Sequence, residues 1–261
     1  MILVMRAMKV ISYACLAMLS SLSSAYAATL WEMNIGKTTS SSSISDIGFT
    51  QTPGGAAGNV SGSVSSLIGL DTMTGAPSSP GTNLGLSTQN IIGNFLAPNV
   101  SLITGPNLAS SYPEQGWCAT MDFSGSGYFS VDSVTLSLRD YNLTNGSWHS
   151  GATAFKVSVS ILDQAGTILG TTTNTINFGQ NHNGPGLFTF SFADMLINMN
   201  EGIQLQVSVY DGGVGQYGNL NGLTQGVLMN KVTFKGELAP EPSAASIGIA
   251  GLGLLMLRRR R

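Results

Sequence analysis

Cysteine, histidine and charged residues are scarce in this 261-residue chain. It holds two cysteines, Cys15 and Cys118, and two histidines, and 9% of its residues are charged. We expect Cys15 to be removed with the N-terminal segment, and a single remaining cysteine cannot form an internal disulfide. One cysteine and two distant histidines do not make a zinc site. The sequence therefore predicts no disulfide, no metal site and no cofactor.

Basic residues are nearly missing from the central part of the chain. Six of the eleven lysines and arginines are Arg6, Lys9 and the four residues 258–261, whereas twelve of the thirteen acidic residues lie between residues 28 and 239. This central part holds five basic and twelve acidic residues, a net charge of −7. An acidic surface repels phosphate backbones, which argues against nucleic acid as a partner.

Long stretches with helical periodicity are absent, and a two-residue alternation of apolar and polar residues appears instead. Turn sequences such as Asn145-Gly146 and Asn200-Glu201-Gly202 separate the alternating runs. Such alternation gives a sheet with one buried and one solvent-exposed face, which is typical of antiparallel sheets. We therefore predict an all-β fold, an antiparallel two-layer β-sandwich of the jelly-roll-like kind. The runs are Val134–Leu138, Phe155–Ile161, Phe188–Phe192, Ile203–Val209 and Val232–Phe234.

The first half of the chain has a weaker pattern. Residues 30–35, 44–50 and 60–70 are predicted to add strands to the same sandwich. Residues 71–115, rich in Gly, Pro, Ser and Asn, form a long loop, and loops of that length are either functional or without fixed structure. No internal repeat and no sharp linker divides the body. We therefore predict one domain over residues 28–238.

The N-terminus has the layout of a secretory signal peptide. Arg6 and Lys9 precede the mostly apolar stretch 10–22, and the small residues Ala25 and Ala27 flank Tyr26. This order predicts cleavage by signal peptidase after Ala27, so that residues 1–27 are removed. Ser12 stands where a lipoprotein signal would have leucine, so Cys15 is not interpreted as a lipid anchor.

The C-terminus consists of three parts in order. Pro240, Glu241 and Pro242 come first, and an apolar run of 14 residues, 244–257, follows them. As a helix this run is about 21 Å long, short of a hydrocarbon core of about 30 Å. It can span a membrane if its ends use interfacial residues, with the final arginines on the cytoplasmic side. These arginines are Arg258, Arg259, Arg260 and Arg261.

Residues 239–261 resemble the PEP-CTERM sorting signal of Gram-negative bacteria. The resemblance implies export, transient anchoring in the inner membrane by a short transmembrane segment, and recognition by an exosortase. It also implies a final place at the cell surface or in the extracellular matrix, often in association with exopolysaccharide. A plain C-terminal membrane anchor is the alternative. The order of predicted strands in the second half of the body, residues 128–238, which ends in a Gly/Tyr-rich loop and residues 227–238, is similar to bodies that carry such tails.

Three patterns that suggest catalysis are better explained without it. Residues 213–218 fit G-x-G-x-x-G, but more turn sequence follows them in place of the helix that a dinucleotide site needs. His149 and His182 lie in Gly-, Asn- and Ser-rich turns outside any nucleophile motif. Paired acids for glycoside hydrolysis must lie about 5–10 Å apart. The candidate acids are spread over separate predicted strand ends, the sequence does not show which of them meet in space, and surface solubility explains them as well; they are Asp132, Asp140, Asp163, Asp194, Glu201 and Asp211. We expect no catalytic residues.

Aromatic residues in predicted loops offer a candidate binding surface. Trp148 lies in the turn sequence Asn-Gly-Ser-Trp-His, and Tyr217 lies in a Gly-rich loop. Flat rings stack on the apolar faces of sugars, so both are candidate glycan contacts. The alternative is that large aromatics fill the core.

The sequence predicts a structural or adhesive protein that is not an enzyme. The alternatives are a module resembling carbohydrate-binding modules that holds exopolysaccharide, and a secreted glycan hydrolase.

Overall fold

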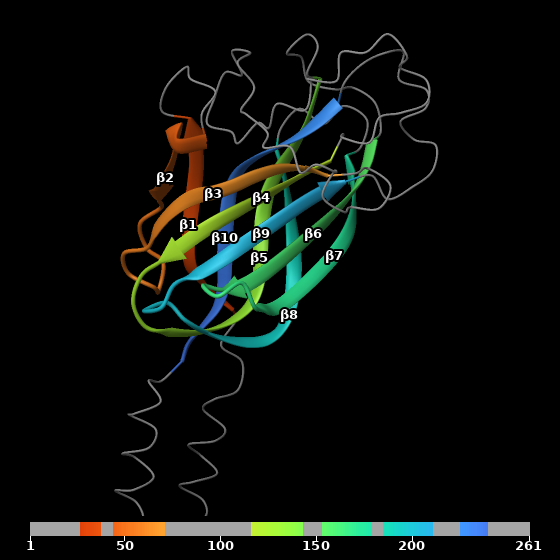
Figure 1. Cartoon of the computed structure of the whole chain (residues 1–261). Helices are drawn as coiled ribbons and strands as arrows, with labels where there is room; N and C mark the ends of the chain where they lie inside the picture. Colours follow the sequence, from red (N-terminus) through yellow and green to blue (C-terminus); the bar gives the residue numbers. More distant parts are fainter. Residues whose placement is uncertain are drawn as a thin grey trace, which may run out of the picture.

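The computed structural model describes residues 27–37, 44–70, 116–142, 153–178, 185–210 and 225–239. These residues form two five-stranded antiparallel sheets packed face to face (Figure 1), which confirms the predicted all-β sandwich. Sheet A has the order β2 (Ile47–Gln51), β1 (Ala28–Lys37), β10 (Gln225–Ala239), β5 (Tyr128–Asn142), β8 (Gly186–Asn198). Sheet B has the order β3 (Ser61–Leu70), β4 (Gly116–Ser124), β9 (Ile203–Tyr210), β6 (Thr153–Asp163), β7 (Ile168–Phe178).

The strand order is that of a jelly roll. The chain passes from one sheet to the other between β4 and β5, β5 and β6, β7 and β8, β8 and β9, and β9 and β10. The four-strand sets β1-β10-β5-β8 and β4-β9-β6-β7 therefore face each other as in double Greek-key sandwiches. Strands β2 and β3 extend the two sheets on one side. Within the described residues, no helix has the length and apolar character needed to cross a bilayer.

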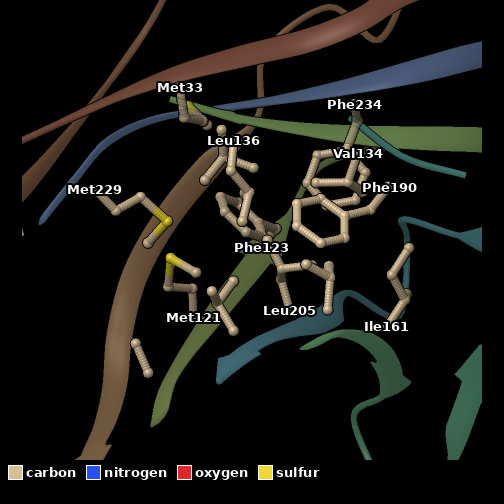
Figure 2. Close-up of a cluster of buried hydrophobic side chains, with 14 of the residues drawn as sticks. Met33, Met121, Phe123, Val134, Leu136, Ile161, Phe190, Leu205, Met229 and Phe234 are labelled. Carbon is tan, nitrogen blue, oxygen red and sulfur yellow. The ribbon is translucent and has the colours of Figure 1, made fainter. Parts of the chain in front are cut away.

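Apolar side chains from both sheets meet in a single core (Figure 2). Strand β9 alternates buried and partly buried residues along its whole length, as the sequence pattern predicts. The indole ring of Trp31 stacks on Phe234 with ring centroids 4.2 Å apart, and Phe123 meets Phe234 edge-on at 5.7 Å. Burying each such large side chain contributes about 1.5–3 kcal/mol to folding. In the described part of the chain, this core packs the two sheets together without a disulfide.

All eight predicted strands are present, and all except β2 and β3 are longer than predicted. Strand β2 begins at Ile47, three residues later than predicted, because Ile44–Asp46 form a short 3-10 helix, η1. Strands β4 and β7 were not predicted. In β7 three of the inward-facing positions, Gly170, Thr172 and Asn174, are polar or lack a side chain, and Ile176 is the buried apolar residue on that face, so no apolar alternation marks the strand.

Both ends of the fold lie at one end of the sandwich, which we call the terminal end. Ala28, the first residue of β1, pairs with Gly236 of β10, and Ala239 pairs with Tyr128 of β5. The short connections 125–127, 164–167 and 199–202 lie at this end as well. We call the opposite end the far end. Its strand residues are Lys37, Leu70, Gly116, Asn142, Thr153, Phe178, Gly186, Tyr210 and Gln225 (Figure 1).

Two predicted turns are confirmed at the terminal end. In the turn between β6 and β7, the carboxylate of Asp163 accepts a hydrogen bond from the backbone N–H of Thr167 at 2.8 Å. The turn between β8 and β9 ends at Gly202, whose φ is 80°. A Cβ atom at Gly202 would lie 3.0 Å from the carbonyl oxygen of Phe123, so glycine fits both the backbone angle and the space.

Candidate functional site

Most residues singled out from the sequence lie outside the described part of the chain. Ala27 is described as an exposed residue directly before β1. The others are outside the described residues, so their predicted roles stay predictions. They are Ala25 of the signal-peptidase site, Pro240, Glu241, Pro242, Arg258, Arg259, Arg260 and Arg261 of the sorting signal, the candidate glycan contacts Trp148 and Tyr217, and His149 and His182.

Two of the three tryptophans are core residues. Trp31 is fully buried and Trp117 is 1% exposed. The indole N–H of Trp117 donates to the carbonyl oxygen of Val227 at 3.2 Å and so links sheet B to sheet A. The large exposed hydrophobic side chains of the described residues are all aliphatic. The large exposed hydrophobic residues of the described ranges thus include no aromatic ring, and Trp148 and Tyr217 stay the predicted sugar contacts.

The strands bring together the anchor points of the two segments that carry these candidates. Residues 143–152, which include Trp148, follow Asn142 of β5, and residues 211–224, which include Tyr217, precede Gln225 of β10. Asn142 and Gln225 are direct partners in sheet A. In sheet B the same two segments connect to β6 and β9, which are also neighbours. Both candidate segments thus join the same two pairs of adjacent strands at the far end.

The outer face of sheet B is a hydroxyl- and amide-rich surface. Hydrogen bonds between neighbouring strands fix its hydroxyl groups. The hydroxyl oxygens of Ser160 and Thr171 lie 2.7 Å apart, and the hydroxyl of Thr173 donates to that of Ser158 at 3.0 Å. Hydroxyl and amide groups donate and accept hydrogen bonds without carrying charge, and the charged residues among them on this face are Lys156 and Asp122. Its members are Thr120, Asp122, Lys156, Ser158, Ser160, Thr171, Thr173, Thr175, Gln204, Gln206 and Ser208.

The outer face of sheet A carries an ordered charge network around Glu32. Its carboxylate lies 3.0 Å from the Lys231 ammonium and accepts hydrogen bonds from the hydroxyls of Thr52 and Thr233. Partial burial raises the pKa of Glu32, but the hydrogen bonds from Lys231, Thr52 and Thr233 outweigh it, so the net pKa is lowered. The ionised carboxylate thus links β1 to β10 and to Thr52, which follows β2. Because its pKa is lowered, it is poorly suited to donate a proton.

Among the described acids, Asp163 is poorly suited to act as a general acid. The pKa of Asp163 is lowered, first by the hydrogen bond from the backbone N–H of Thr167, whereas a general acid needs a raised pKa. Glu201 lies in the turn between β8 and β9. Within the described ranges, no three His, Cys, Asp or Glu side chains are grouped to hold a metal ion.

The thiol of Cys118 is buried on strand β4. Its exposed fraction is 3%, and burial raises its pKa, an effect that a hydrogen bond with Ser208 partly offsets. A buried thiol with a raised pKa is a poor nucleophile, so Cys118 acts as a small core residue.

No family model and no curated protein sequence matches this chain. Among solved structures, the C-terminal domain of a chitobiase from Bacteroides fragilis is similar at 15% identity and a TM-score of 0.33, over 69% of this chain and 95% of that one. A family 32 carbohydrate-binding module from C. perfringens, solved with galactose, is similar at 12% identity and a TM-score of 0.25, over 67% and 93%. Part of a CocE/NonD family hydrolase from Staphylococcus aureus is similar at 8% identity and a TM-score of 0.28, over 46% and 31%. Similarity of this size concerns the fold alone.

Proposed function

We propose that this chain is an exported, exosortase-processed protein of the cell surface or extracellular matrix, with a structural or adhesive task. One observation carries the proposal. Strand β1 begins at Ala28, directly after the predicted signal-peptidase site, and β10 ends at Ala239, directly before Pro240. Removal of residues 1–27 and 240–261 would leave every described strand complete.

The positions of the two strand ends also fit transient anchoring in a membrane. Ala28 and Ala239 both lie at the terminal end, so both predicted targeting segments leave the fold from the same side. Four residues, 240–243, separate β10 from the apolar run, and when fully extended they reach about 14 Å. An anchored tail would keep the terminal end near the bilayer and turn the far end outward, where it is free to make contacts.

The sorting step is tested by replacing Pro240, Glu241 and Pro242 together with alanine in the native cell. We expect the variant to keep its C-terminal tail and to accumulate in the inner-membrane fraction, because the extended motif that an exosortase would bind is lost. Glu237→Ala, an exposed acid shortly before the motif, is the matched control and should be processed like the natural protein. Normal processing of the triple variant would contradict the proposal.

A second candidate task is holding exopolysaccharide at the far end. It is supported by the pairing of Asn142 with Gln225, which anchors the segments of Trp148 and Tyr217 on adjacent strands. Loss of one stacking ring removes about 1.5 kcal/mol, so Trp148→Ala should weaken pull-down by the native polysaccharide about tenfold. Leu187→Ala, an exposed side chain at the far end of β8, is the control.

Two outcomes of that experiment would point elsewhere. If Trp148→Ala and Leu187→Ala bind the polysaccharide equally well, Trp148 is not a sugar contact, and the structural task is favoured. Release of reducing sugar by the purified protein, abolished by substitution of one carboxylate, would favour the secreted hydrolase.

A further inference from the structure

The four edge strands of the sandwich differ in how well they are protected from pairing with another chain. An open edge presents unpaired backbone groups, and proteins blunt such edges with short strands, bulges or covering groups. Strand β2 has five residues, and β3 has an irregular register between Val64 and Ser66. Edge β8 is covered by β7, since Thr172 donates to the carbonyl oxygen of Ser191 at 2.6 Å and Asn174 to that of Thr189 at 3.3 Å.

Within the described residues, strand β7 has none of these protections along most of its length. It spans eleven residues, Ile168–Phe178, with no charged residue and no proline. Its register with β6 shifts between Ile168 and Gly170 and is regular from Gly170 onward. It ends the order of sheet B, so β6 is its single neighbour in the sheet.

Hydrogen bonds to the neighbouring strands fix several side chains of β7. Thr171, Thr173 and Thr175 are exposed on its outer face. The hydroxyls of Thr171 and Thr173 are fixed by hydrogen bonds to Ser160 and Ser158 of β6. On the inner face, Thr172 and Asn174 are fixed to β8. Since little side-chain freedom remains to be lost, β7 is preorganised for a further strand.

We propose that β7 pairs with β7 of a second copy of this chain, antiparallel and around a two-fold axis at Thr173. Thr173 is the midpoint of Ile168–Phe178 and of the run Thr171–Thr175. This register sets Thr171 opposite Thr175 and Thr172 opposite Asn174 of the second copy. Cross-strand pairs of β-branched and hydroxyl side chains are favourable, and no like charges face each other. The two copies would share one continuous ten-stranded sheet.

A second copy fits this edge better than an unrelated strand because the edge is self-complementary. An isologous two-fold interface needs one patch that matches itself, and an uncharged threonine-rich strand does so. The inference depends on strand β7 alone. It holds or fails whether or not the chain is exported and sorted as proposed above.

Disulfide cross-linking of the full chain tests the pairing. In Thr173→Cys the two new cysteines would face each other with Cα atoms about 4.5–5.5 Å apart, within the range of a disulfide. We expect a covalent dimer on a non-reducing gel that disappears on reduction. The unmodified chain, which contains Cys15 and buried Cys118, should give little covalent dimer on the same gel, and so should Thr50→Cys, an exposed position on edge β2.

The register is tested by two further variants. Thr171→Cys and Thr175→Cys should each cross-link poorly alone but well when mixed, because these positions face each other across the axis. Thr173→Lys should weaken dimerisation in sedimentation measurements by more than about tenfold relative to Thr50→Lys, since two lysines would oppose each other. A monomeric natural protein, equal cross-linking of Thr173→Cys and Thr50→Cys, or cross-links from Thr173→Cys to other proteins only would overturn the proposal.

Discussion

Glu32 is the residue at which charge contributes most visibly to the described fold. Its carboxylate joins Lys231 and the hydroxyls of Thr52 and Thr233, and its net pKa is lowered as a result. A lowered pKa in the folded state means that the stabilisation is present above the ordinary pKa, near 4.5, and is lost as the pH falls below it. Glu32 therefore contributes to the free energy of unfolding at neutral pH, and this contribution decreases in acid.

We predict that Glu32→Gln lowers the free energy of unfolding by about 0.5–1 kcal/mol at pH 7, the size typical of partly exposed ion pairs. The difference between the variant and the natural protein should shrink as the pH is lowered toward 3. Urea unfolding at several pH values measures it. A difference that stays constant from pH 7 to pH 3 would show that the charge of Glu32 contributes nothing.

Individual residues also show what sequence reasoning could and could not determine about the site. Trp31 and Trp117 are as aromatic as Trp148, yet they alternate with polar residues inside strands and are buried. Trp148 lies among turn residues, and that difference in context was visible in the sequence. The convergence of its segment with that of Tyr217 was not visible, because it follows from the pairing of Asn142 with Gln225, which are far apart in the chain.

At the scale of strands, the sequence was informative wherever one face is apolar and the other polar. Strand β9 alternates without a break and was predicted almost to its ends. Strand β4 alternates too, with Trp117, Ala119, Met121 and Phe123 buried, and could have been predicted by the same rule. Strand β7 could not, because Gly170, Thr172 and Asn174 occupy three of its inward positions and leave Ile176 as the buried apolar residue of that face. The side chains of Thr172 and Asn174 donate hydrogen bonds to backbone carbonyls of β8. An edge strand with mainly polar residues shows no regular alternation of apolar and polar residues in its sequence.

Turns at the terminal end are the second element with a testable requirement. Gly166 and Gly202 both have positive φ, 84° and 80°, but a Cβ atom has open space at Gly166 and would approach the Phe123 carbonyl at Gly202. We predict that Gly166→Ala costs about 1 kcal/mol of unfolding free energy through backbone strain alone. Gly202→Ala should cost more, because the clash adds to the strain. Thermal unfolding of both variants measures this, and equal losses would contradict the close approach seen here.

At the scale of the whole molecule, the fold fits between two segments that we expect to be temporary. The sandwich starts at Ala28 and ends at Ala239, and both residues lie at the terminal end. The part between the segments is acidic, with a net charge of −7, while most of the basic residues lie within the segments themselves. On our proposal the terminal end serves attachment and the far end is left for contact with the surroundings.

The intact mass of the protein recovered from its native cell tests this account most directly. We predict a chain that begins at Ala28 and lacks Arg258–Arg261, with any group added at the new C-terminus visible as extra mass. Recovery of a chain that still runs from Met1 to Arg261 and is not associated with a membrane would contradict it.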